Sequence, residues 1–343
     1  MTSIKDIAKE LNLAVSTVSM ALNDNEKISK ETRRLVHEKA KEMKYVRNGA
    51  AVDLQKQKTN LILFVLYDAS RSFFSYTIKS LQIATAELGY DFLISTTYGG
   101  HRNTAERFIK ERRADAVIVY TKTISDELLT QYASADFPVF VLGHDAVTDN
   151  PYVKSFLAPE VRPLLTCEYL IEKGHRRIGF VTGFAESFGT VRSMNGFRLS
   201  MSRHGLPVDE SLIFDAGGSQ MEDGYNVAEK QILSRLDDMD GLIFSNDDIA
   251  VGAMKCFNDH NIVIPDRISV IGQHNIPASA TTMPPLTTLT SITSGQELFS
   301  KLVKCLDSYI RMEPDLELEK ELQSHQSEQM IVERQTVKDL NKR

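Results

Sequence analysis

The sequence contains only three cysteines, and they are far apart. Cys167, Cys256 and Cys305 form no Cys-x-x-Cys pair and have no paired histidines near them. Such spacing argues against a disulfide framework and against a zinc site, and it is typical of buried thiols in a reducing compartment. The sequence therefore predicts neither disulfides nor a metal site.

Long hydrophobic runs are also missing. No apolar run approaches the roughly 18 residues that a membrane span requires. The opening residues, MTSIKDIAKE, are charged and lack the apolar segment of a signal peptide. We therefore expect a cytoplasmic protein with no membrane partner.

The short motifs of common enzyme classes are absent as well. The chain has no GxGxxG, GxxxxGK[ST], GxSxG or HExxH motif. The pairs Asp247-Asp248 and His144-Asp145 could act as acid and base, but a helix cap or a polar loop explains each of them equally well. The sequence predicts no cofactor and no catalytic residue.

The charge is unevenly distributed along the chain. The 343 residues carry a formal net charge of -6, and 42% of them are hydrophobic, which is ordinary for a globular protein. Residues 1–60 contain 12 Lys and Arg against 8 Asp and Glu, whereas the remainder contains 28 against 38. A small basic head on a larger acidic body indicates that only the head contacts a polyanion.

The basic head has the pattern of a three-helix unit. Ser3 and Asp6 form a capping-box signature, and Asn12 suits the left-handed turn between two short helices. A third helix is expected from Ser29. The predicted buried positions are Ile4, Ile7, Ala8, Leu11, Val18, Ala21, Leu22, Leu35, Val36, Ala40 and Met43. This arrangement is typical of a helix-turn-helix that reads DNA, and a helical dimerisation module is the alternative.

The body alternates short apolar runs with amphipathic segments. The runs LILFVL, DFLIST, AVIVY, PVFVL, RIGFVT, GLIF and ISVIG have the character of strands covered on both faces. Alternation of this kind predicts parallel sheets with helical crossovers, here in two doubly wound lobes. In such sheets, ligands bind outside the carboxyl ends of the strands.

The head resembles the headpiece of the LacI family of bacterial transcriptional regulators. The matching residues are IKDIAKELNLAVSTVSMALN, ISKETRRLV and YVRNGAAVDLQKQKT. The resemblance implies base reading by Val15, Ser16 and Met20, phosphate contacts by Thr17, Asn23 and Ser29, and a minor-groove hinge with Asn48, Ala51 and Leu54. Departures from the family pattern are Met20 in place of a common Arg, Ala14 in place of a Ser cap, and Asp53 in the hinge.

The body resembles the effector domain of the same family, which has a periplasmic-binding-protein-like core. EYLIEKGHRRIGFVTG, FSNDDIAVGAMKCF, IPDRISVIG and PPLTTL carry the resemblance. The effector residues that it implies are Phe73, Phe74, Arg192, Asn246, Asp247 and His274. Because His274 replaces a carboxylate, an anionic effector such as a sugar phosphate or sugar acid is expected beside a neutral sugar. His274 could equally be a loop brace.

The resemblance implies a ligand-responsive regulator, a repressor of carbohydrate uptake or catabolic genes that binds palindromic operator DNA as a homodimer. The expected parts are a headpiece at 1–46, a hinge at 47–59 and a core at 60–343. The first lobe would comprise about 60–157 and 291–320, and the second 158–290 and 321–343. A solute receptor of a transport system is the alternative, and a dinucleotide-dependent enzyme is a more distant one.

Overall fold

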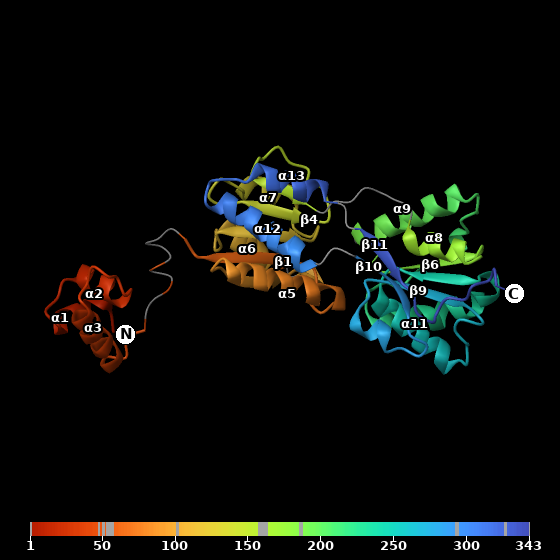
Figure 1. Ribbon diagram of the computed structural model, residues 1–343, viewed down its shortest axis with the longest axis horizontal. Helices are drawn as coiled ribbons and strands as arrows, with labels where there is room; N and C mark the ends of the chain where they lie inside the picture. Colours follow the sequence, from red (N-terminus) through yellow and green to blue (C-terminus); the bar gives the residue numbers. More distant parts are fainter. Residues whose placement is uncertain are drawn as a thin grey trace. The chain divides into compact units, whose positions relative to one another are not determined.

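The computed structural model describes residues 2–46, 49, 52, 58–100, 103–156, 164–184, 188–291, 295–325 and 328–342. The chain divides into two compact units, Met1–Thr59 and Asn60–Arg343. The larger unit contains two sheets, each flanked by helices (Figure 1). The three cysteines are free and buried.

The smaller unit is the predicted three-helix headpiece. Its helices are α1 (Ile4–Glu10), α2 (Val15–Leu22) and α3 (Lys30–Glu42). Ser3 and Asp6 form the predicted capping box, and Asn12 takes a φ of 51° in the turn before α2. The fully or nearly fully buried core residues are Ile7, Ala8, Val18, Ala21, Val36 and Ala40.

The prediction for Leu35 was wrong, because its side chain is 44% exposed. Successive residues of an α-helix point about 100° apart, so neighbours cannot both face a narrow core. Val36, Ala40 and Met43 follow the inward face at spacings of four and three residues. Leu35 therefore lies on the adjacent, solvent-facing side of α3.

The first lobe has a five-stranded parallel sheet in the order β2-β1-β3-β4-β5. Its strands are β1 (Leu61–Leu66), β2 (Asp91–Thr96), β3 (Ala116–Tyr120), β4 (Val139–Leu142) and β5 (Val153–Phe156). Its helices are α5 (Ser72–Glu87), α6 (Asn103–Lys110), α7 (Asp126–Tyr132), α12 (Gly295–Ile310) and α13 (Leu316–Ser324), and a short turn, η1, spans Tyr98–Gly100.

Helices cover both faces of this first sheet, as the continuous apolar runs predict. Along β1, Phe64 packs beneath α5, α12 and α13, while Leu63 and Val65 face α6 and α7. Figure 1 shows α5 and α12 side by side on the sheet. Because the buried Leu322 belongs to this core, α13 packs with the first sheet.

The second lobe has a six-stranded sheet in the order β11-β10-β9-β8-β6-β7, in which only the β10–β11 pair is antiparallel. Its strands are β6 (Ile178–Thr182), β7 (Ile213–Asp215), β8 (Gly241–Phe244), β9 (Ser269–Gln273), β10 (Thr287–Ser291) and β11 (Gln329–Val332).

Helices α8 (Leu165–Glu172) and α9 (Phe188–Arg203) cover one face of this second sheet. Helices α10 (Met221–Val227) and α11 (Asp247–Asp259) cover the other. Shorter helical turns are η2 (Glu210–Leu212), η3 (Ala228–Ile232), η4 (Leu233–Asp238) and η5 (Pro277–Ala280). The chain passes between the two sheets after β5, after β10 and after α13. In each sheet, therefore, the loops that follow the parallel strands lie at the same edge, together with the residues that they carry.

Candidate functional site

Helix α2 of the headpiece exposes the side opposite its buried Val18. Val15 is 43% exposed, Ser16 is exposed, and Thr17 and Met20 are half-buried. The helix begins after Ala14, which offers no side-chain cap, so the first backbone N–H groups of α2 receive no hydrogen bond from that residue. An uncapped helix N-terminus beside hydroxyl groups is suited to phosphate oxygens.

Asn23 and Ser29 already make local hydrogen bonds. The Asn23 amide donates to the Ser19 carbonyl at 2.8 Å, and the Ser29 hydroxyl accepts from the Thr32 backbone N–H at 3.1 Å. Ser29 is therefore the cap of α3, and Asn23 ends α2. The remaining predicted DNA contacts, Asn48, Ala51 and Leu54, lie outside the described residues.

In the larger unit, side chains from both lobes meet at the carboxyl ends of the strands. The Tyr67 ring, after β1, stacks on the Phe184 ring, after β6, at a centroid distance of 5.5 Å. The Ser72 hydroxyl donates to an Asp248 carboxylate oxygen at 2.9 Å. We call the place where these pairs meet the cleft.

Asn246 and Asp247 stand at the start of α11, beside the cleft, and have structural partners. The Asn246 side-chain oxygen accepts from the Ile249 N–H at 2.8 Å, which caps the helix. Asp247 is fully buried and accepts from the Thr288 hydroxyl at 2.6 Å and the Ile276 N–H at 3.0 Å. Burial raises the pKa of Asp247 to about 7, although both hydrogen bonds oppose the shift. In this structure Asp247 braces the loops around β9 and β10.

His274 follows β9 and has a φ of 99°, a strained conformation for a residue with a side chain. Its side chain is exposed to solvent, yet protein surrounds it deeply enough that burial lowers its pKa to about 4, with a smaller contribution from Arg192. His274 is therefore neutral at pH 7.

Arg192, on α9, is half-buried. Burial lowers its pKa, and its guanidinium also interacts electrostatically with Tyr120 of the first lobe. Its charge also contributes to the lowered pKa of His274.

The two phenylalanines at the start of α5 are Phe73 and Phe74. Phe74 is 5% exposed and packs edge-on against Tyr120, with ring centroids 5.3 Å apart. It belongs to the first lobe's core and supports the ring of Tyr120. Phe73 lies in the first turn of the helix, and its side chain is outside the described residues.

Comparison with known proteins accounts for both units. Residues 3–48 match the family model described as bacterial regulatory proteins, lacI family, and residues 167–336 match a periplasmic binding protein-like domain. The HTH-type transcriptional regulator DegA of Bacillus subtilis is 31% identical over 84% of this chain and 86% of its own. The chain belongs to the lacI family.

Solved structures of family members share the fold. A lac repressor dimer bound to operator and an anti-inducer matches with a TM-score of 0.75 at 19% identity, covering 98% of this chain and 99% of that one. A complex of the regulator CelR with cellobiose matches with a TM-score of 0.66 at 18% identity, covering 98% and 100%. The family and the fold predicted from the sequence are confirmed.

Membership of the family decides between the functions that the sequence left open. The chain is a DNA-binding transcriptional regulator and not an enzyme. The headpiece match, together with the relative aligned over 84% of this chain, excludes the transport receptor, the dinucleotide-dependent enzyme and the purely structural helical module.

Several cleft residues were missed by sequence reasoning. All of them lie at, or just after, the carboxyl end of a strand: Tyr67, Arg71, Tyr120, Phe184 and Asp248. Their position after a strand could have identified them as cleft candidates, because the strands themselves were recognised from their apolar runs. No feature of the sequence indicated how these residues pair across the two lobes.

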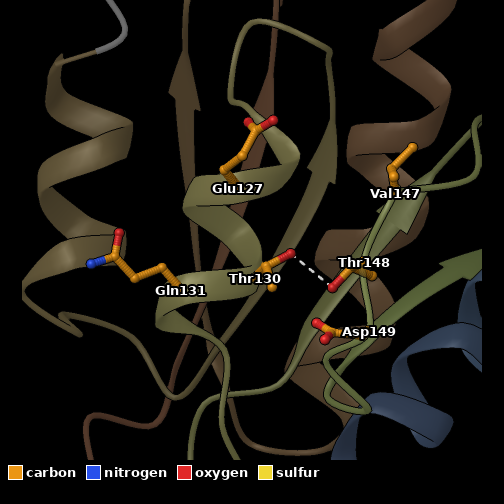
Figure 2. Close-up of a pocket in the computed structure, with 6 residues that line it drawn as sticks. All are labelled: Glu127, Thr130, Gln131, Val147, Thr148 and Asp149. Atoms are coloured by element: carbon orange, nitrogen blue, oxygen red, sulfur yellow. Dashed lines mark hydrogen bonds between the residues drawn. The ribbon is translucent and has the colours of Figure 1, made fainter.

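A second depression lies beside α7, outside the cleft (Figure 2). It is lined by Glu127, Thr130, Gln131, Val147, Thr148 and Asp149. Figure 2 shows Thr130 and Thr148 facing each other, joined by a 2.7 Å hydrogen bond between their hydroxyls, while Gln131 points away. None of the predicted effector residues lines it, and its polar groups do not converge on a common point.

Two further findings concern the described part of the chain. It contains no group of three or more His, Cys, Asp or Glu side chains arranged to hold a metal ion. No helix within the described ranges is long and apolar enough to cross a membrane.

Proposed function

We propose that this regulator is a cytoplasmic repressor of carbohydrate uptake or catabolic genes that binds a palindromic operator and responds to a small-molecule effector. The observation that carries the proposal is the self-contained headpiece, whose core leaves one side of α2 exposed. The lac repressor bound to operator and the CelR–cellobiose complex, to which the chain is similar, support the choice of a repressor with a sugar effector.

On this proposal the headpiece contacts divide into two kinds. Val15, Ser16 and Met20 read base edges in the major groove, where apolar atoms contact thymine methyl groups. Thr17, Asn23 and Ser29 position the phosphate backbone, in addition to their roles at helix ends. The hinge would supply Asn48, Ala51 and Leu54, with Leu54 wedged between base pairs in the minor groove.

In the core, the proposed effector contacts are Phe73, Arg192, Asn246 and His274. The half-exposed Asn246 keeps part of its amide accessible while capping α11. Phe74 and Asp247 support these contacts from the two lobe cores. The cleft at the strand ends is the position where ligands bind in doubly wound sheets.

We further propose that the protein is a homodimer with a headpiece at 1–46, a hinge at 47–59 and a dimerising core at 60–343. A two-fold operator requires two headpieces. Tyr76 is 53% exposed and Ile83 is 38% exposed, and they lie seven residues apart on the same side of α5. An exposed apolar stripe of this kind suits a subunit contact. Sedimentation equilibrium at micromolar concentration should give twice the chain mass, and a monomeric or tetrameric mass would contradict the proposal.

The operator is best found by selecting sequences from random duplex DNA with the full-length protein. We expect enrichment of a palindrome, which then serves in fluorescence-anisotropy titrations beside a random duplex. Ser16→Ala should weaken operator binding by about 1–3 kcal/mol and leave random binding unchanged, because it removes a base contact.

Lys30→Gln is the matched variant for the phosphate contribution. It should weaken operator and random binding alike, and reduce the slope of log affinity against log salt by about 1. If no palindrome is enriched, or if Ser16→Ala weakens both duplexes equally, the proposed reading by α2 is wrong.

A further inference from the structure

The larger unit begins with a backbone clamp at Asn60. This residue is the first of that unit and immediately precedes β1. Its N–H donates to an Asp115 carboxylate oxygen at 2.9 Å, and its carbonyl oxygen accepts from the Asp91 N–H at 2.7 Å. Both backbone polar groups of Asn60 are therefore held, one by the residue before β3 and the other by the first residue of β2.

The Asp115 side chain is the part of this clamp that local backbone pairing does not supply. Asp115 is buried, and its own N–H donates to the Leu61 carbonyl oxygen at 2.8 Å. Its carboxylate therefore adds a charge-assisted hydrogen bond at the start of the β1–β3 pair, and such bonds are stronger than those between neutral groups. Asn60 is exposed and has a φ of 51°, in the left-handed region that asparagine enters more easily than most residues. An exposed residue keeps such a conformation only where its neighbours fix it.

The second lobe contains the same clamp at the equivalent place. The Asp240 N–H, just before β8, donates to the Arg177 carbonyl oxygen at 2.9 Å, and the Asp240 carboxylate accepts from the Arg176 N–H at 3.2 Å. Since β6 pairs with β8 in the register in which β1 pairs with β3, Asp240 is the structural equivalent of Asp115. Arg176 is likewise the equivalent of Asn60.

The two clamps differ in the segment that precedes them. Before Arg176, the chain is already held inside the second lobe, because His175 is buried and its N–H donates to the Leu170 carbonyl oxygen of α8 at 3.0 Å. Before Asn60 lies the proposed hinge, and the division between the two compact units falls between Thr59 and Asn60. The first clamp therefore holds the end of a linker, whereas the second holds a segment that packing fixes anyway.

The first clamp is attached to the most protected part of its lobe. Strands β1 and β3 lie inside the sheet, with a neighbour on each side, and Ile62–Leu66 and Ala116–Val119 are buried. Central strands of this kind open only when the whole unit unfolds. A linker that starts from such a fixed point allows the domain at its other end fewer positions than a linker that starts from a loose residue.

We infer that Asp115 is a positioning residue for operator recognition: by holding Asn60, it fixes the point and the backbone direction from which the hinge continues. This inference rests on the proposed hinge and on the proposed homodimer. Two half-sites at a fixed spacing require two headpieces at matching positions, whereas random DNA is bound mainly through charge. Loss of the clamp therefore weakens binding to the operator and leaves binding to random DNA unchanged.

The test uses the full-length protein, the selected palindrome and a random duplex in fluorescence-anisotropy titrations. Asp115→Ala removes the acceptor and should weaken palindrome binding about 5–30-fold, the factor that corresponds to freeing the backbone of one residue, with random binding unchanged. Asp115→Asn keeps a side-chain oxygen that can accept from the Asn60 N–H. It should therefore bind the palindrome within about threefold of wild type.

Asp240→Ala is the matched control, because it removes the equivalent carboxylate and the same charge from the second lobe. It should leave the ratio of palindrome to random affinity unchanged, even if its melting temperature falls. If Asp115→Ala does not fold, Asn60→Gly takes its place. Asn60 is exposed, and glycine allows the same positive φ with more conformational freedom, so this variant should lower the ratio in the same direction.

Three results would overturn the inference. The first is an unchanged affinity ratio in Asp115→Ala, or in Asn60→Gly where it is the variant measured. The second is an equal fall of the ratio in Asp240→Ala, which would assign the effect to general destabilisation. The third is an Asp115→Asn protein no better than Asp115→Ala, since the lost charge and not the hydrogen bond would then be responsible. A wild-type protein that enriches no palindrome would instead contradict the proposed function, and the role of the clamp with it.

Discussion

The headpiece depends on a very small core, and Val18 is at its centre. Val18 is fully buried between the other helices of the unit, with Ile7, Ala21 and Val36 as equally inaccessible neighbours in the same cluster. Val18→Ala removes two methyl groups. At about 0.8 kcal/mol per buried carbon, with a further cost for the cavity, the expected loss is about 2–3 kcal/mol.

This loss is large for a unit of this size, because cores of such small domains rarely supply more than about 3–5 kcal/mol. A loss of about 2–3 kcal/mol corresponds to a factor of about 25–150 in the unfolding equilibrium. Hydrogen–deuterium exchange read by mass spectrometry reports the two units separately. Protection of peptides from residues 2–46 should fall by that factor, while peptides from 60–343 keep theirs.

Leu35→Ala is the control, since it also truncates a large aliphatic side chain of the headpiece. The Leu35 side chain is 44% exposed, so its truncation should change stability by no more than about 0.5 kcal/mol. Equal loss of protection in the two variants would mean that the headpiece core has been assigned wrongly. Loss of protection in the larger unit of Val18→Ala would show that the headpiece does not unfold on its own.

Two predictions concern the second lobe. Burial raises the pKa of Asp247 to about 7, so the folded state binds this proton more tightly than the unfolded chain, and its contribution to stability is lost as pH rises from about 4 to about 7. Asp247→Asn should remove this pH dependence of the free energy of unfolding, which is up to about 1.4 kcal/mol per pH unit, when urea denaturation is measured at several pH values. An unchanged slope of the free energy of unfolding against pH would contradict the assignment. A β-carbon on Gly252 of α11 would lie 1.8 Å from the Met221 carbonyl oxygen, so Gly252→Ala should destabilise this lobe by at least about 2 kcal/mol. Gly189→Ala, on α9 with nothing within 4 Å, is the control for thermal denaturation and should not destabilise; equal effects would argue against close packing of α10 on α11.

Local pattern was sufficient for much of the fold. The apolar runs that became β1, β3, β4, β6, β8 and β9 were recognisable because strands covered on both faces need hydrophobic residues at every position. The headpiece was recognisable from the Ser3 cap and the Asn12 turn, since capping and left-handed turns depend on residues only a few positions apart. In contrast, β5 (VKSF) and β7 (IFD) are short edge strands with polar positions, and their sequences alone did not predict them.

Contacts between distant segments were decided by the tertiary structure alone. Asp247 and Asp248 are neighbours of the same type at the start of one helix. Because successive helical residues point about 100° apart, Asp247 turns into the second lobe to brace Thr288, while Asp248 reaches Ser72 of the first lobe. The sequence determined that carboxylates stand at this strand end. Which of them holds a lobe together and which joins two lobes depends on how segments 41 and 176 residues apart in the chain pack, and no local pattern encodes that.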